Sequence, residues 1–376
     1  MRIARFYDHL DRYLTPNKVL IIYGPRRVGK TSLVKNYLQS TKYNFRFDTG
    51  DDIVVQNTLS SQNLNKIKEF VGEKKLVVID EAQNISEVGV ALKLMVDNIN
   101  DICIIATGST SFDLASKIGE PLVGRSRIIE LFPISQLELS QKNTPYDLKR
   151  NLEQYLLFGS YPEVITASTN KEKARILTQT VRSYLLKDIL AIERVKSPHL
   201  LHKLLKLLAF QLSNEVSLNE LASQLEIDRK TVERYLYLLE QSFILFSLPP
   251  YSTNLRKAIS KKYKYYFVDL GIRNAIINNF NNLETRNDVG QLWENFIISE
   301  RIKKQNYQEI YSNNYFWRTY DQKEIDYIEM RDGKLNGYEF KWNKTNSKNK
   351  QAWLNSYPDE ALFEVINKNN YLKFVS

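Results

Sequence analysis

The amino-terminal part of the chain contains a glycine-rich segment whose residue types and spacing suit phosphate binding. The pattern G-x-x-x-x-G-K-[ST] follows the apolar run at 19–23 and is formed, with Ser32 next, by Gly24, Pro25, Arg26, Arg27, Val28, Gly29, Lys30 and Thr31. Glycines at 24 and 29 allow backbone N–H groups to approach phosphate oxygens, because no Cβ obstructs the turn. Lys30 would neutralise the β- and γ-phosphates, while Thr31 would offer its hydroxyl to Mg²⁺. The segment therefore predicts an ATP- or GTP-binding loop between a strand and a helix that begins near Lys30.

An acidic pair at the end of a second apolar run supplies the groups that nucleotide hydrolysis needs. The run 76–79 is followed by Asp80 and Glu81, as expected of a buried parallel strand that delivers carboxylates to its C-terminal edge. Asp80 would hold Mg²⁺, and Glu81 would polarise the attacking water. Segments 43–48 and 102–109 are also expected to be strands, so an inserted strand should separate the lysine-bearing strand from the Asp-Glu strand.

With these two motifs the chain resembles, over nearly its whole length, the prokaryotic AAA-type ATP-binding proteins that carry a C-terminal domain of unknown function. The resemblance implies a polar sensor residue at the end of the fourth strand. We predict Ser109, with Thr107 as the alternative, and Ser109 equally suits the N-cap of a following helix. The placement of Arg125 ahead of strand 128–132 resembles that of an arginine finger. Such an arginine would act from a neighbouring subunit, and a solvated surface arginine is the competing interpretation.

Length and composition bound the architecture. The chain has 376 residues, more than a single core usually supports. We predict an α/β protein with four parts: a P-loop AAA-type parallel-sheet domain (1–134), a helical lid (135–195), a winged helix (196–252) and a restriction-endonuclease-like α/β domain (253–376). The single cysteine, Cys103, lies in an apolar run and should be a core residue, which excludes a disulfide framework. No apolar run is long enough to span a bilayer and no signal-peptide pattern is present, so we expect a cytoplasmic protein without a membrane partner.

The distribution of charge suggests contact with nucleic acid at two segments. The net charge of +10 favours polyanionic partners. On the expected recognition helix of the winged helix, four side chains would face solvent: Arg229, Lys230, Thr231 and Arg234. Three glutamates dilute this basic face: Glu226, Glu233 and Glu240. The winged helix therefore either contacts DNA or serves as a packing module. The segment 256–264, with five cations and no acid, either follows a nucleic-acid backbone or is a solvated connector.

Four ionisable residues of the last third have the order of a metal-dependent nuclease site. They are Glu294 on an expected helix, Asp326 and Glu339 on consecutive expected strands, and Lys341. Asp326 and Glu339 would bind one Mg²⁺ or Mn²⁺, while Lys341 steadies the attacking hydroxide. The set resembles the D…E-x-K signature of restriction-endonuclease-like folds, in which Glu294 matches the acidic residue of the first core helix. A structural charge cluster is the alternative, because buried charges need a metal or partners.

These inferences predict a Mg²⁺-dependent ATPase that couples its nucleotide state to a DNA-binding or nuclease-like C-terminal domain. The expected cofactors are ATP and Mg²⁺, with Mg²⁺ or Mn²⁺ at the C-terminal site. The expected partners are ATP and DNA or another nucleic acid, and a homo-oligomer is a further expectation. The alternative function is a non-cleaving ATP-dependent switch whose C-terminal domain binds DNA or a protein partner.

Overall fold

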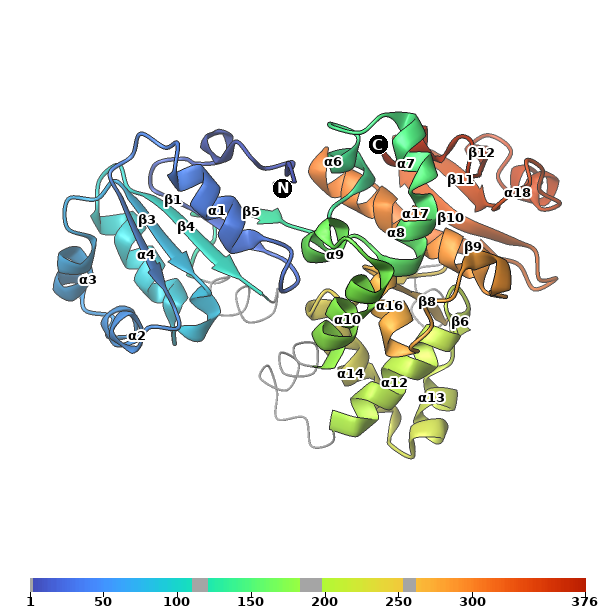
Figure 1. Cartoon of the computed structure of the whole chain (residues 1–376), viewed down its shortest axis with the longest axis horizontal. Coiled ribbons are helices and arrows are strands. Elements are labelled where there is room, and N and C mark those ends of the chain that lie inside the picture. Colours follow the sequence, from blue (N-terminus) through green and yellow to red (C-terminus); the bar gives the residue numbers. More distant parts are fainter. Residues whose placement is uncertain (1–2, 110–120, 183–197, 253–261) are drawn as a thin grey trace. The chain divides into compact units, whose positions relative to one another are not determined.

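The computed structural model describes residues 3–109, 121–182, 198–252 and 262–376. Its contacts divide the chain into two units, shown in Figure 1. The N-terminal unit comprises Ala4–Phe132 and Gln241–Phe243, and the C-terminal unit comprises Met1–Ile3, Pro133–Glu240 and Ile244–Ser376. The helix expected after Ser109, the last part of the expected lid and most of the basic segment lie outside the described residues.

A five-stranded parallel sheet forms the centre of the N-terminal unit, with the strand order β2-β3-β4-β1-β5 (Figure 1). The strands are β1 (Lys18–Tyr23), β2 (Phe45–Thr49), β3 (Leu76–Asp80), β4 (Cys103–Gly108) and β5 (Ser126–Glu130). Strand β4 lies between β1, which precedes the glycine-rich loop, and β3, which ends in Asp80. The inserted strand predicted from the sequence is therefore confirmed. Every residue of β3 and β4 is buried, as in parallel sheets covered on both faces.

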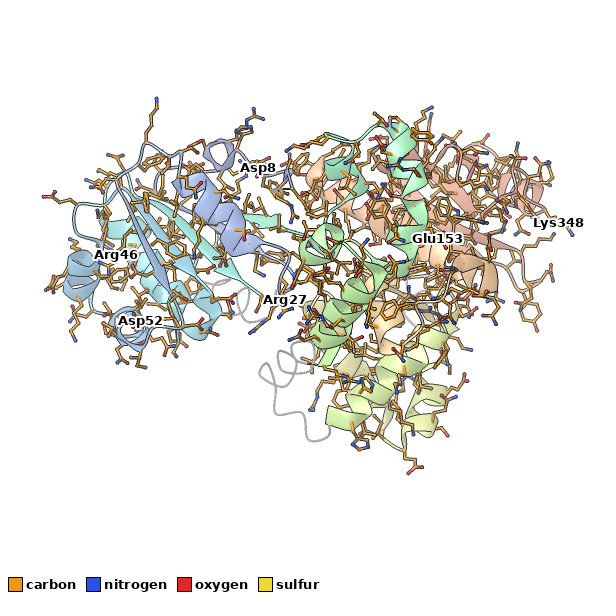
Figure 2. All side chains as sticks on the ribbon, viewed as in Figure 1. Asp8, Arg27, Arg46, Asp52, Glu153 and Lys348 are labelled. Carbon is orange, nitrogen blue, oxygen red and sulfur yellow. The ribbon has the colours of Figure 1, made fainter. Side chains whose placement is uncertain are left out.

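Helices supply the rest of the N-terminal core. They are α1 (Lys30–Leu38), α2 (Ile53–Ser60), α3 (Leu64–Val71) and α4 (Val88–Asn98), with the short 3-10 helices η1 (Leu10–Arg12) and η2 (Ala82–Asn84). Helices α2, α3 and α4 share one hydrophobic cluster with alternate strand residues such as Val77 and Ile79, as the two-residue period of a strand requires. At the edge of the sheet, the guanidinium group of Arg46 on β2 lies 3.9 Å from the centre of the Phe70 ring (Figure 2). This contact covers the exposed edge strand.

The expected lid begins with five short helices. They are α6 (Gln136–Leu139), α7 (Pro145–Arg150), α8 (Leu152–Phe158), α9 (Pro162–Thr166) and α10 (Asn170–Thr180). The buried side-chain amide of Asn274, on α16 (Leu270–Ile276), donates to the main-chain oxygens of Leu156 and Leu157 at 3.0 and 2.9 Å. These bonds fix α8 against α16, so the helices of this segment pack within the C-terminal unit. Their role as a lid stays a prediction.

Three helices and a small antiparallel sheet follow. The helices are α12 (Pro198–Phe210), α13 (Leu218–Leu225) and α14 (Arg229–Gln241), and the strands are β6 (Glu215–Val216), β7 (Leu245–Leu248) and β8 (Tyr263–Phe267). The strand order is β6-β8-β7, so β8 pairs with strands on both sides. This pairing joins β8 to strands that precede residue 252, and the domain boundary between residues 252 and 253 stays a prediction. The assignment of this group as a winged helix stays a prediction.

The last part of the chain contains a second, mixed sheet with the order β12-β11-β10-β9. The elements of this part of the chain are η4 (Leu283–Thr285), α17 (Val289–Tyr307), β9 (Asn313–Arg318), β10 (Glu324–Arg331), β11 (Lys334–Phe340), α18 (Lys350–Ser356), β12 (Ala361–Ile366) and α19 (Tyr371–Val375). Strands β9, β10 and β11 are antiparallel, and β12 returns parallel to β11. The buried Arg301 of α17 binds Glu329 of β10 through two hydrogen bonds of 2.5 and 2.9 Å, which ties the long helix to the sheet.

Two glycines in helices of the C-terminal unit provide a matched test of this packing. A Cβ at Gly271 of α16 would lie 2.1 Å from the main-chain oxygen of Phe158, whereas a Cβ at Gly290 of α17 would meet nothing within 4 Å. We expect Gly271→Ala to lower the free energy of unfolding by about 1–3 kcal/mol through overpacking. Gly290→Ala should raise it by about 0.5–1 kcal/mol, because alanine favours the helix. Urea unfolding measures both, and effects of the same sign would contradict the packing of α8 on α16.

Candidate functional site

The glycine-rich loop is shaped by its contact with the chain after β5. The main-chain N–H of Leu131 donates to the oxygen of Tyr23 at 2.8 Å. Gly24 has a φ of +149°, and a Cβ there would lie 2.1 Å from the oxygen of Leu131. Only glycine therefore fits at this point. At the other end of the loop, Gly29 adopts a left-handed conformation and is the N-cap of α1. The N–H groups of the first helical turn consequently border the loop.

The lysine of the loop is held within it. Lys30 is 5% exposed, and its Nζ donates hydrogen bonds of 2.8 and 2.9 Å to the main-chain oxygens of Gly24 and Pro25. These carbonyls belong to the turn that would surround a phosphate. The ammonium group is thus positioned at the loop, where phosphate oxygens can take the place of the carbonyl acceptors.

A short polar network joins the helix to the end of β3. The hydroxyl of Thr31 donates to Asp80, with distances of 2.8 and 3.1 Å to its two carboxylate oxygens. Thr107 of β4 donates to the same carboxylate at 2.5 Å and accepts a hydrogen bond from the main-chain N–H of Glu81 at 3.1 Å. Threonine and aspartate oxygens are the hard ligands that Mg²⁺ prefers, so Thr31 and Asp80 fit a magnesium site beside the loop.

Glu81 is oriented by a residue that the sequence analysis did not identify. Its backbone is left-handed, with a φ of +49°, and its carboxylate accepts a 2.5 Å hydrogen bond from the side-chain amide of Gln83. The same amide lies 3.3 Å from the hydroxyl of Ser109. Thr107 therefore contacts Asp80 directly. Ser109 is linked to Glu81 only through the side-chain amide of Gln83. Gln83 is 6% exposed, and its position two residues after Glu81 is the only sequence signal for it.

Arg5 is a second residue that the sequence motifs did not indicate, and it supports the glycine-rich loop. Arg5 is 8% exposed, and its guanidinium group donates to the main-chain oxygens of Val28 at 2.5 Å and Phe132 at 2.6 Å. The arginine therefore links the loop to the chain that follows β5. No motif marks this residue, because its partners are main-chain oxygens far away in the sequence.

Arg125 and the glycine-rich loop lie at opposite ends of two neighbouring strands. It precedes β5, whereas Gly24 follows β1, and these two strands are parallel neighbours. Its guanidinium group forms a 2.7 Å ion pair with Asp97 and is 41% exposed. Within one chain the arginine therefore points away from Lys30, so a finger role requires a neighbouring subunit and stays a prediction.

In the C-terminal unit, the predicted carboxylates converge at the junction of β10 and β11. Tyr327 pairs with Tyr338 in the antiparallel register, so Asp326 and Glu339 occupy the next positions along the two strands. An extra residue in β10 between Ile325 and Ile328 re-aims this part of the strand. Asp326 accepts a 2.7 Å hydrogen bond from the N–H of Phe340. Burial, together with the negative charge of Glu294, raises the pKa of Asp326 to about 8.

Lys264 of β8 provides the positive charge of this cluster. Its side chain is 1% exposed, lies 3.3 Å from Glu294 and also binds Glu324. Burial favours the neutral amine, but the neighbouring carboxylates raise the pKa of Lys264 above its ordinary value. The sequence predicts that the segment 256–264 contacts nucleic acid or is a solvated connector. That expectation is wrong for Lys264, because its side chain is buried in β8 against Glu294, whereas Lys262, which precedes the strand, is exposed.

The remaining carboxylate is paired as well. Glu339 is 3% exposed, accepts a hydrogen bond from the Ser347 hydroxyl and forms a 2.7 Å ion pair with Lys341. Within the described ranges, no group of three or more His, Cys, Asp and Glu side chains is placed to hold a metal ion. The four predicted residues are therefore brought to one region, where Glu294 and Glu339 are paired with lysines and Asp326 accepts a main-chain hydrogen bond. A metal at this site stays a prediction.

Three known families match separate parts of the chain. Residues 16–140 match a family described as an AAA domain. This part of the chain is therefore similar to AAA domains. Residues 149–283 match the domain of unknown function DUF8612, and residues 289–370 match the domain of unknown function DUF4143. The ion pair between Lys264 and Glu294 therefore joins the DUF8612 region to the DUF4143 domain.

Relatives that match most of this chain occur in bacteria and archaea. An uncharacterized protein of Mycobacterium tuberculosis is 26% identical over 345 residues, which cover 90% of this chain and 73% of the relative. An uncharacterized protein of Methanocaldococcus jannaschii is 24% identical over 385 residues, covering 96% of this chain and 83% of the relative. One of Haemophilus influenzae is 25% identical over 345 residues, covering 87% and 83%. Among the described residues, none of the helices is long and apolar enough to cross a membrane.

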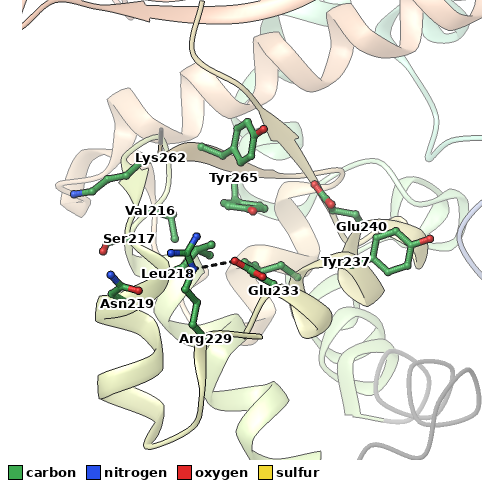
Figure 3. Close-up of a pocket in the computed structure, with 12 residues that line it drawn as sticks. Val216, Ser217, Leu218, Asn219, Arg229, Glu233, Tyr237, Glu240, Lys262 and Tyr265 are labelled. Carbon is green, nitrogen blue, oxygen red and sulfur yellow. Dashed lines mark hydrogen bonds and ion pairs between the residues drawn. The ribbon is translucent and has the colours of Figure 1, made fainter. Parts of the chain in front are cut away.

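The expected DNA-facing side of α14, in the DUF8612 region, is partly occupied by local contacts. Arg229 forms a 2.9 Å ion pair with Glu233 (Figure 3), and Thr231 donates to Asp228 at 2.6 Å. Arg229 and Lys262 line a cavity of about 420 Å³ beside this ion pair. An exposed pair one helical turn apart contributes only about 0.3–0.5 kcal/mol, so Arg229 is readily released to another anion. Contact between this helix and DNA stays a prediction.

The paired carboxylates around Lys264 generate a test of stability. Lys264→Met keeps the length of the side chain but leaves the buried Glu294 without its cation, while Glu324 retains an ion pair of 3.8 Å with Arg318. We expect the free energy of unfolding to fall by about 3–5 kcal/mol, because an uncompensated buried charge remains. Lys262→Met removes the same charge from an exposed position and should change it by less than about 0.5 kcal/mol. Equal losses in the two variants, measured by chemical denaturation, would contradict a structural role for the Lys264 charge.

Proposed function

We propose that the AAA domain binds ATP with Mg²⁺ and hydrolyses it. The observation that carries this proposal is the hydrogen bond from Thr31 to Asp80, which brings the hydroxyl of the loop and the carboxylate of β3 to one point beside the Lys30 ammonium. Bound Mg²⁺ would neutralise charge on the β- and γ-phosphates at that point. Threonine and aspartate would then exchange their mutual contact for the metal.

The residues around this point would bind the phosphates, accept a proton and position the other groups. Lys30 would bind the β- and γ-phosphates as a point charge. Glu81 would accept a proton from the attacking water, and the amide of Gln83 would hold its carboxylate until a nucleotide is bound. Thr107 would keep Asp80 and the main chain of Glu81 in register. Each of these groups lies at the C-terminal edge of the sheet, where ligands of parallel α/β folds bind.

We further propose that nucleotide state is coupled to the C-terminal unit. The segment Gln241–Phe243 packs as part of the N-terminal unit, although the chain on both sides of it belongs to the C-terminal unit. The Phe243 ring lies 5.5 Å from the ring of Tyr23, the residue before Gly24, and 6.3 Å from Phe132. A movement of the loop on nucleotide binding would therefore reach the end of α14 directly.

For the DUF4143 domain, we propose a binding role for DNA or a protein partner in preference to cleavage. The pairing of Lys264 with Glu294 and of Lys341 with Glu339 supports this choice, because two of the three carboxylates already have a cation partner. The nuclease interpretation rests on the same residues. Asp326 and Glu339 occupy adjacent strand positions beside Lys341, and a metal would have to displace the existing pairs.

The ATPase proposal predicts two different failures. Lys30→Ala should abolish binding of ATP, because the charge that faces the phosphates is removed. Glu81→Gln should retain ATP binding but lose turnover, because an amide cannot accept the proton of the water. Calorimetric titration measures binding and phosphate release measures turnover. The exposed Lys42 supplies the control, since Lys42→Ala should leave both unchanged. Normal turnover in Lys30→Ala and Glu81→Gln would refute the assignment.

The C-terminal proposal predicts no cleavage of nucleic acid. The full chain is incubated with duplex, single-stranded and structured substrates in the presence of Mg²⁺ or Mn²⁺, alongside Lys341→Ala and the exposed control Lys344→Ala. We expect all three proteins to leave the substrates intact. Cleavage that persists in Lys344→Ala and disappears in Lys341→Ala would instead establish the nuclease interpretation.

A further inference from the structure

A cavity of about 570 Å³ in the C-terminal unit lies outside the sites described above. Its lining combines an aromatic ring with charged side chains from separate elements: Trp342, Lys149, Arg150, Lys368, Glu153 and Glu284. Glu153 projects from α8 (Figure 2), and Lys149 and Arg150 form the end of α7. The volume falls in the range of cavities that bind small molecules and single nucleotides.

Trp342 forms the aromatic wall of the cavity, and its ring packs against a second tryptophan. It is partly exposed, and its ring centre lies 5.3 Å from that of the fully buried Trp293. The Lys368 ammonium lies 5.7 Å from the centre of the Trp342 ring. A fixed aromatic ring next to a cation is the arrangement that proteins use to stack a base and neutralise its phosphate.

The cations and the remaining wall add a phosphate-binding rim. Lys149 donates a 2.9 Å hydrogen bond to the main-chain oxygen of Asn369, which holds its ammonium group next to Lys368. The first residue of the 19-residue helix α17, Val289, also lines the cavity. The side chain of its N-cap residue, Asp288, makes no capping hydrogen bond and instead binds Arg273 and Arg286. The positive end of the helix therefore adds to the attraction for an anion.

From this combination we propose that the cavity binds a nucleobase together with its attached phosphate. The base stacks on Trp342, and the phosphate contacts Lys368 and Lys149. The carboxylates of Glu153 and Glu284 can accept hydrogen bonds from an exocyclic amino group of the base. Both a free mononucleotide and the end of a single nucleic-acid strand carry this chemistry.

Binding of labelled oligonucleotides to the full chain without ATP tests the proposal. Fluorescence anisotropy is followed for a short 5′-phosphorylated single-stranded DNA, with dAMP or unlabelled oligonucleotide as competitor. We expect Trp342→Ala to weaken binding about tenfold, and Trp342→Phe to restore most of the affinity, because stacking needs only a ring. Lys368→Glu should weaken binding by a similar factor and reduce its dependence on salt. Lys66→Glu makes the same charge change at an exposed position of α3 and should bind like the wild type.

The outcomes distinguish a free mononucleotide from the end of a nucleic-acid strand, and this cavity from other binding sites. Competition by dAMP assigns the cavity to free nucleotides, and competition by oligonucleotide alone assigns it to a strand end; either supports the proposal. Failure of the wild type to bind any probe overturns it. Undiminished binding by both Trp342→Ala and Lys368→Glu also overturns it, because the contacts then lie elsewhere. Lys30→Ala should bind the probes normally, which distinguishes this site from the ATP site.

Discussion

The contact between Thr31 and Asp80 is the interaction on which the nucleotide site depends. It spans from the first turn of α1 to the end of β3, although β4 lies between β3 and the strand that leads into the loop. The contact can form only if the loop turns sharply over β1, which requires the close approach of Gly24 to Leu131. Arg5 keeps this turn in place by binding main-chain oxygens on both sides of it. The geometry of the site is thus a property of the whole parallel sheet.

The C-terminal unit is organised by buried charges that neutralise each other. Lys264 joins the DUF8612 region to α17 through Glu294, and Arg301 joins α17 to β10 through Glu329. Buried pairs of this kind contribute little relative to apolar residues, but losing one partner is costly. They therefore specify which elements pack together more than they add stability. In the cluster with the residue types of a metal site, pairing of the same kind already engages Glu294 and Glu339.

Around the proposed nucleotide site, the sequence predicts the local structure because the residues of each motif are close in sequence and tied to main-chain geometry. The loop, the acidic pair after β3 and the inserted strand follow from short patterns in which each residue type has one physical reason. Arg5 and Gln83 were missed because their roles depend on partners that the fold supplies. Lys264 was misplaced for the same reason: a run of cations looks solvated until β8 turns one of them inward. The pairing of β8 with β6 and β7 likewise leaves no local signal in the sequence.

The dependence of ATP affinity on Mg²⁺ tests the central claim most directly. Isothermal titration of the full chain with ATP, with and without Mg²⁺, is compared between the wild type and Asp80→Asn. If Thr31 and Asp80 together hold the metal, Mg²⁺ will strengthen ATP binding by the wild type, and Asp80→Asn will lose that gain while still binding the nucleotide through the loop. An equal gain from Mg²⁺ in both proteins would contradict the account.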